Sequence, residues 1–211
     1  MTMQIITEKN NAYPAAFDSR LHKKNKAPHG IRWTVDEYYQ MNELGLFYGR
    51  RVELIKGEIF EMSTMLSPHA TSIQLVMKLL SEIFDDGFVV RPQMPLSFSK
   101  IDEPEPDVAV VEGSIRDFTE VHPKTTALLV EVASTSLKFD RTKKLALYAE
   151  NRITEYWIVN LKQRRLEVFR EPMTTENGGF DYVERLILGE EEFISPLEKP
   201  DAKIRVADML P

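Results

Sequence analysis

The chain has 211 residues, of which 43% are hydrophobic and 28% charged, and its formal net charge is −6. This balance is typical of a folded globular domain, and the acidic charge argues against a protein whose main task is non-specific binding to nucleic acid. The absence of cysteine excludes disulfides and thiolate metal sites. Since neither a membrane-spanning run nor a signal-peptide pattern is present, we expect no membrane association and a cytoplasmic location.

Residues 1–30 are polar, lack periodicity and contain the basic run HKKNK. Such a segment is typical of a flexible arm, and an arm that contacts nucleic acid or a second subunit is the alternative. We therefore expect a flexible N-terminal arm over residues 1–30 and a single domain over residues 31–211.

Helix and hairpin signals begin directly after this arm. Thr34 and Glu37 have the spacing of a capping box, which predicts a helix that runs to about Glu43. Apolar residues then alternate on both sides of Lys56-Gly57. That pattern predicts two short strands joined by a tight turn within residues 50–62.

A longer series of helices and strands follows the hairpin. Residues 67–86 carry apolar side chains at three- and four-residue spacing, which predicts an amphipathic helix with Ser67 as its cap and Pro68 in its first turn. A second helix is expected over residues 137–151, and strands are expected over residues 88–90, 95–98, 108–111, 127–133, 155–161, 165–171 and 180–188. This order predicts a mixed α/β sheet with helices packed on it.

Glu131 occupies an unexpected position in the apolar run ALLVEVA. Because side chains alternate along a strand, Glu131 shares a face with Leu129 and Ala133. A lone buried carboxylate costs several kcal/mol unless it is paired, protonated or bound to a metal. Satisfaction by an arginine or by backbone donors is one explanation, and metal binding is the other.

Asp107 repeats this anomaly at the start of the preceding strand. It falls on the same face as Ala109 and Val111. If the two strands are neighbours, the carboxylates of Asp107 and Glu131 converge. Two carboxylates, a carbonyl and waters are a typical ligand set for Mg²⁺.

The helix after Glu131 offers a cation. Asp140, Lys144 and Tyr148 stand at positions i, i+4 and i+8, on one side of a helix. Lys144 is placed to extend over the sheet toward Glu131 and Asp107, where it would position a water and stabilise charge on a phosphate. A solvent-facing ion pair between Asp140 and Lys144 is the alternative.

Four segments together resemble one known family: VELIKGEIFEMSTMLSPH, PDVAVV, LLVEVASTS and DRTKKLALYAENRITEYWIVN. The set is similar to the Uma-two family, a large bacterial group within the PD-(D/E)XK nuclease superfamily. The resemblance covers about residues 33–188. It implies a restriction-endonuclease-like α/β (α+β) fold, with a mixed sheet flanked by helices, and an endonuclease that hydrolyses DNA with Mg²⁺ or Mn²⁺.

The resemblance also assigns acidic ligands. Asp107, which follows Pro106, matches the metal-binding aspartate of the superfamily, and Glu131 matches its second acidic ligand. Glu53 matches the upstream acidic residue that often completes the metal cluster. Glu58 is the alternative for that role.

The lysine of the superfamily motif is displaced in this chain. It usually lies two residues after the second acid, where this chain has Ala133. The family has a lysine on the next helix instead, and Lys144 matches it, with the neighbouring Lys143 as the alternative. We therefore expect Asp107, Glu131, Lys144 and Glu53 to be catalytic.

Supporting roles near the site are assigned to His69, Glu58, Asp140 and Tyr148. His69 begins the long helix, where a histidine is often structural, and Tyr148 is alternatively a core aromatic.

The leading hypothesis is thus a Mg²⁺-dependent DNA endonuclease. The alternative is a catalytically inactive protein that keeps the nuclease fold as a DNA-binding or assembly module, which the acidic charge and Ala133 favour. A third interpretation is a structural homodimer that uses the strands after Glu155, and a homodimer is expected in any case because most soluble oligomers are symmetric.

Overall fold

The computed structural model describes residues 29–211, so the predicted arm over residues 1–30, including HKKNK, lies almost entirely outside the described residues. Arg32–Pro211 forms one compact unit. Its helices are α1 (Val35–Glu43), α2 (Ser67–Ile83), α3 (Leu137–Phe139) and α4 (Leu145–Glu150), with a π-helical turn η3 (Asp140–Lys144) between the last two and short 3₁₀ turns η2 (Ile115–Phe118) and η4 (Val206–Met209). Its strands are β1 (Val52–Ile55), β2 (Glu58–Glu61), β3 (Phe88–Pro92), β4 (Val108–Glu112), β5 (Leu128–Ala133), β6 (Glu155–Asn160), β7 (Arg165–Thr174), β8 (Phe180–Gly189), β9 (Phe193–Ile194) and β10 (Ile204–Arg205).

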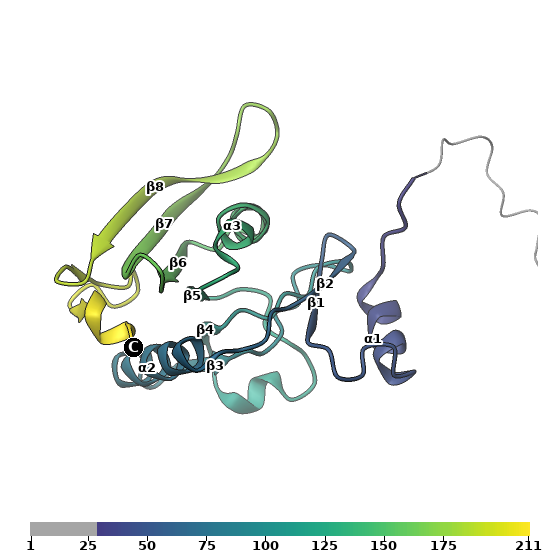
Figure 1. Ribbon diagram of the computed structural model, residues 1–211, viewed down its shortest axis with the longest axis horizontal. Helices are drawn as coiled ribbons and strands as arrows, with labels where there is room; N and C mark the ends of the chain where they lie inside the picture. The colour runs from purple at the N-terminus through teal and green to yellow at the C-terminus, as the bar shows by residue number, and fades with distance from the viewer. Residues whose placement is uncertain (1–28) are drawn as a thin grey trace, which may run out of the picture. The chain divides into compact units, whose positions relative to one another are not determined.

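A six-stranded sheet in the order β3-β4-β5-β6-β7-β8 forms the centre of this unit. Its neighbouring strands are antiparallel except for the parallel pair β5 and β6. A parallel pair needs a crossover connection, and α3, η3 and α4 supply it. Helix α2 packs on one face of the sheet and α3 on the other (Figure 1). The expected mixed sheet flanked by helices is confirmed.

The two faces of β5 pack into different cores. Val130 and Val132 pack with Val76 of α2, whereas Leu129 packs with Leu147 of α4 on the opposite face. The alternation predicted for this strand is therefore confirmed. The face that carries Glu131 is the one covered by the crossover helices.

The β1–β2 hairpin turns at Lys56 and Gly57, which have φ angles of 53° and 71°. Positive φ at both central residues is typical of a type I′ turn, which suits the twist of a hairpin. The turn also lies against other backbone: Trp33 N donates to Gly57 O at 2.9 Å, and Gly57 N donates to Ile101 O at 2.8 Å. A Cβ atom on Gly57 would lie 2.8 Å from Arg32 Cβ. Position 57 therefore requires glycine for two reasons: the positive φ angle, and the lack of room for a side chain beside Arg32.

Several predicted boundaries agree with the structure and others differ. The capping box of Thr34 and Glu37 is present at the start of α1. Helix α2 includes Pro68 in its first turn, but its N-cap is Leu66, without a side-chain hydrogen bond, so the assignment of Ser67 as the cap is wrong. Ser67 is the first residue of the helix itself, one position after the N-cap, so its hydroxyl does not cap the free amides of the first turn.

Two further differences arise from tertiary contacts. Residues 95–98 form no strand, because the amides of Leu96 and Ser97 donate to the loop carbonyls of Pro104 and Pro123. The helix expected over residues 137–151 is interrupted by η3. The strands β9 and β10 were not predicted, since two residues give no periodic pattern.

Within residues 29–211, no helix has the length and apolar character needed to cross a bilayer.

We predict that Gly57→Ala destabilises the protein more than Gly178→Ala. Both glycines have φ near 75°, where an alanine costs about 1–2 kcal/mol. Space around Gly178 is open, whereas the new methyl group at Gly57 meets backbone. Urea unfolding of the two variants measures the difference, and equal losses would contradict the close approach described here.

Candidate active site

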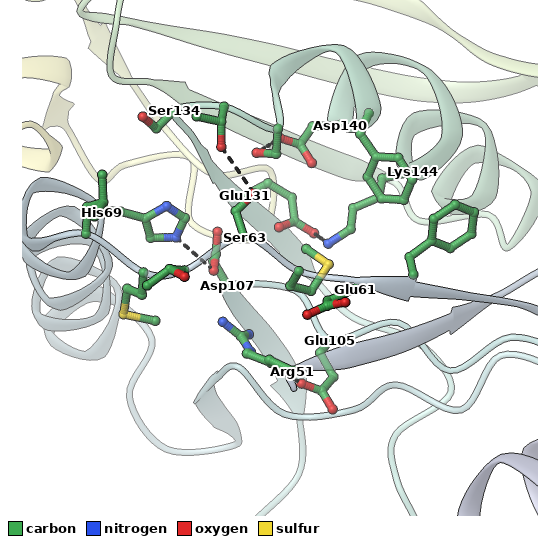
Figure 2. A pocket seen from close by; sticks show the side chains of 18 of the residues that line it. Arg51, Glu61, Ser63, His69, Glu105, Asp107, Glu131, Ser134, Asp140 and Lys144 are labelled. Atoms are coloured by element: carbon green, nitrogen blue, oxygen red, sulfur yellow. Dashed lines mark hydrogen bonds and ion pairs between the residues drawn. The ribbon is translucent and has the colours of Figure 1, made fainter. Parts of the chain in front are cut away.

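A cavity of about 540 Å³ lies where the β1–β2 hairpin, the start of α2, the strands β4 and β5 and the turn η3 meet. Charged and apolar side chains share its lining (Figure 2). The charged residues are Arg51, Glu61, Glu105, Asp107, Glu131, Asp140 and Lys144, with His69 beside them. Of the eight residues assigned to the site from the sequence, five line this cavity, namely His69, Asp107, Glu131, Asp140 and Lys144.

Asp107 is held at the end of the pairing between β4 and β5. The amide of Val132 donates to Asp107 Oδ2 at 2.9 Å, so a side chain continues the ladder where backbone pairing ends. Asp107 Oδ1 accepts from Gln93 Nε2 at 3.1 Å and lies 3.2 Å from His69 Nε2. Burial alone would raise the pKa of Asp107. The hydrogen bond with His69 and the charges of His69 and Lys144 outweigh burial, so the pKa is lowered.

Glu131 and Lys144 form a buried ion pair. Lys144 Nζ donates to Glu131 Oε1 at 2.8 Å, and the hydroxyl of Tyr148 donates to the same oxygen at 2.6 Å. Lys144 Nζ also lies 3.3 Å from Glu53 Oε2, which accepts from the amide of Glu105 at 3.1 Å. Figure 2 shows the ammonium of Lys144 pointing toward the carboxylate of Glu131. The hypothesis that Lys144 extends over the sheet agrees with this geometry.

The charges at this site do not balance. Within the part of the chain that the structure describes, the buried carboxylates of Glu53, Asp107, Glu131 and Asp140 surround one buried ammonium, that of Lys144. Burial raises the pKa of Glu131 to about 8, against the attraction of Lys144 and with repulsion from the other three acids. Burial likewise raises the pKa of Asp140 to about 6. A pKa near 8 leaves Glu131 partly protonated at neutral pH, which offsets some of the negative charge, and a bound cation would displace that proton.

The pKa of Lys144 moves in the direction that keeps its charge. Burial would lower it, but the carboxylates of Glu131, Glu53 and Asp140 outweigh burial and raise it. The lysine is therefore an ammonium at neutral pH.

The residues present fit a divalent cation. Among residues 29–211, no group of three or more histidine or acidic side chains is arranged to hold a metal by itself. Mg²⁺, however, is usually bound through one or two carboxylates, with waters and substrate phosphates as its other ligands. Asp107 and Glu131 supply two such carboxylates at the cavity, and the buried Oε1 of Glu53 has no hydrogen-bond partner. The negative charge of the lining favours a cation in the cavity, and Glu53, which does not line the cavity, adds to that charge from behind Lys144.

The turn η3 sets the positions of Asp140 and Lys144. The amide of Leu145 donates to Asp140 O, five residues back, which widens the helix locally. Both side chains are buried, so the alternative of a solvent-facing Asp140–Lys144 pair is wrong. Asp140 Oδ2 instead accepts from Ser136 Oγ at 2.6 Å.

The other three assigned residues, Glu53, Glu58 and Tyr148, do not line the cavity, and of these Glu58 makes no contact with Lys144 or Glu131. Glu58 is 41% exposed and pairs with Arg32 at 2.5 Å and with Lys143 at 2.9 Å. Neither Glu58 nor Lys143 lines the cavity. Glu53, rather than Glu58, is the hairpin acid that contacts Lys144.

Sequence reasoning missed the roles of Gln93 and Glu105. Gln93 was given no role, although its side chain holds Asp107. Glu105 was likewise given no role, although it lines the cavity and burial raises its pKa. Gln93 has a φ of 46°, a conformation that no residue pattern in RPQMP signals.

Comparison with known proteins gives a family and a fold. Residues 35–207 match the Uma2 family, described as "Putative restriction endonuclease". The structure is similar to the crystal structure of "a putative nuclease belonging to DUF820 from Anabaena variabilis ATCC 29413", with a TM-score of 0.65 and 13% sequence identity over 83% of this chain and 96% of that one. At this identity, the likeness shows a shared fold. No curated protein matches the chain.

We predict that Lys144→Met strongly destabilises the protein. The variant keeps the volume of the side chain but removes the cation that the surrounding carboxylates share, and breaking a buried pair costs about 3–5 kcal/mol. The control is Lys138→Met on the exposed side of α3, which should change stability by less than about 0.5 kcal/mol. Urea unfolding at neutral pH measures both, and similar values would contradict a structural role for this ion pair.

Proposed function

Since this chain belongs to the Uma2 family, we propose that it is a divalent-metal-dependent endonuclease that hydrolyses phosphodiester bonds in DNA. One observation carries the proposal. Asp107 and Glu131 come from neighbouring strands and line one cavity, with the ammonium of Lys144 against Glu131. Paired carboxylates can hold a metal ion for phosphodiester hydrolysis, and a nearby lysine can offset the charge that develops on the phosphate.

Asp107 and Glu131 would hold Mg²⁺ or Mn²⁺, and Glu53 would add to the negative charge that attracts the cation. When bound, such an ion polarises a phosphate and lowers the pKa of a coordinated water. His69 and Gln93 keep the carboxylate of Asp107 in place through its Oδ1 atom.

Lys144 takes over the role that Ala133 cannot perform. The usual motif lysine would start from the position of Ala133, on the same strand as Glu131. Lys144 brings its ammonium to Glu131 from the neighbouring helical segment instead. Its fixed charge lies at the cavity lining and would offset charge that develops on the phosphate.

A catalytically inactive module with the nuclease fold is the second candidate. It is favoured by the position of Lys144, whose side chain is 1% exposed and pairs with both Glu131 and Glu53. This lysine already neutralises part of the cluster without a metal. Such a protein would bind DNA or assemble with a partner without cleavage. The homodimer and the cytoplasmic location stay predictions under both candidates.

We predict that Asp107→Asn and Glu131→Gln each lower the rate of DNA hydrolysis in Mg²⁺ by about a hundredfold or more, because each removes a negative charge that would hold the metal ion at the cavity. The matched control is Asp36→Asn, an exposed aspartate on α1, which should cleave like the parent. Cleavage of a labelled DNA measures the rates, with circular dichroism to verify folding. Parent-like cleavage by the Asp107 and Glu131 variants would rule out this assignment of the site.

Calorimetric titration with Mn²⁺ separates the two candidates. We expect the parent to bind Mn²⁺ in the micromolar to millimolar range, and the double variant Asp107→Asn, Glu131→Gln to release no binding heat, because its two cavity ligands are neutral. Asp36→Asn again serves as the control. If the parent binds no Mn²⁺, the inactive module is the better description.

A further inference from the structure

One part of the cavity lining is apolar. Phe60, Met62, Met65, Leu66 and Phe139 contribute to it, together with Pro68. We call Phe60, Met62, Met65, Leu66 and Phe139 the apolar rim. Three of its members come from the connection between β2 and α2, and they line the same cavity as the carboxylates.

Two rim residues of the connection, Met65 and Leu66, lie outside the hydrophobic cores. Met65 is 39% exposed and Leu66 is 62% exposed, and neither belongs to a hydrophobic core of the described residues. The rings of Phe60 and Phe139, which line the same cavity, have centroids 5.0 Å apart. Methionine and leucine side chains beside an aromatic pair form an adaptable apolar surface. A ligand for this cavity therefore needs an apolar part as well as a charged part.

The size of the cavity restricts the ligand. A volume of about 540 Å³ falls within the range of small-molecule sites, roughly 300–1,000 Å³. A nucleotide fits such a space, whereas a base in a stacked duplex is inaccessible to it. Enzymes that take a base into a pocket act on single strands or extrude the base first.

The charge of the lining also argues against a duplex. Proteins that bind duplex DNA through its backbone typically make about 6–10 phosphate contacts with lysine and arginine. Among the described residues that line the cavity, the basic side chains are Arg51, His69 and Lys144, and Lys144 is buried. Arg51 lies 3.8 Å from Glu105, which reduces its local charge. Such a lining suits one or two phosphates.

We propose that the site takes an unpaired DNA strand, with one base against the apolar rim and the adjoining phosphodiester at Asp107 and Glu131. This inference rests on the proposed function and names its substrate class. A duplex binder gains its affinity from many backbone contacts. Here, stacking and apolar contact of a base at the rim would supply the binding energy instead, and any base can make these contacts because every base has a π-face.

Fluorescence anisotropy tests the proposal with the full chain in Ca²⁺. The probes are a labelled single strand of mixed sequence and the same strand annealed to its complement. We expect the single strand to bind at least about tenfold more tightly, and the double variant Met65→Ala, Leu66→Ser to lose about tenfold of that affinity. The control is Ile187→Ala on β8, which removes a side chain of similar exposure, 61%, and should bind like the parent.

The outcomes distinguish the two proposals. Duplex binding as tight as single-strand binding, rim variants that bind like Ile187→Ala, or no binding to either probe would overturn the inference. Cleavage of the same probes in Mg²⁺ and Mn²⁺ is measured in parallel. Rim-dependent binding of the single strand without any cleavage would overturn the proposed endonuclease but not the preference for an unpaired strand. Faster cleavage of the duplex than of the single strand would support the proposed endonuclease and overturn the preference for an unpaired strand.

Discussion

The buried ion pair between Lys144 and Glu131 is the interaction on which the arrangement of the site depends. It joins η3 to the central strand β5, and the second contact of Lys144, with Glu53, joins the hairpin to both. Buried charges are tolerated when they are paired, so the crossover helices and the hairpin are constrained to the positions that satisfy this lysine. The cavity lies where these three segments meet, and its acidic lining follows from the same constraint.

The central part of the site could be predicted because it depends on local alternation. Along β5, each second side chain faces the crossover helices, and Glu131 interrupts that apolar series. Asp107 repeats the anomaly on β4, and the pairing of Val108 with Val130 places the two strands side by side. Helix spacing indicated Lys144, the motif resemblance added Glu53, and the two side chains lie 3.3 Å apart.

The remaining features depend on tertiary contacts that leave no periodic trace. All four residues of β1 are buried, so alternation could not separate Glu53 from the exposed Glu58. The unusual backbone of Gln93 is held by a hydrogen bond from its amide to Asp107 O at 3.1 Å, a contact that extends the β3–β4 pairing by one residue. The amides of residues 95–98 find partners in loops rather than in a ladder. Sequence patterns describe the strands that carry the carboxylates better than the surroundings that orient them.

The π-helical turn has a consequence for the position of Lys144. It contains one residue more than the α-helical turn it replaces, and each residue of an α-helix adds a rotation of about 100°. Deletion of a single residue from η3 would therefore turn either Lys144 or the whole of α4 away from its present neighbours. The contacts of Lys144 with Glu131 and Glu53 therefore depend on the number of residues in this turn.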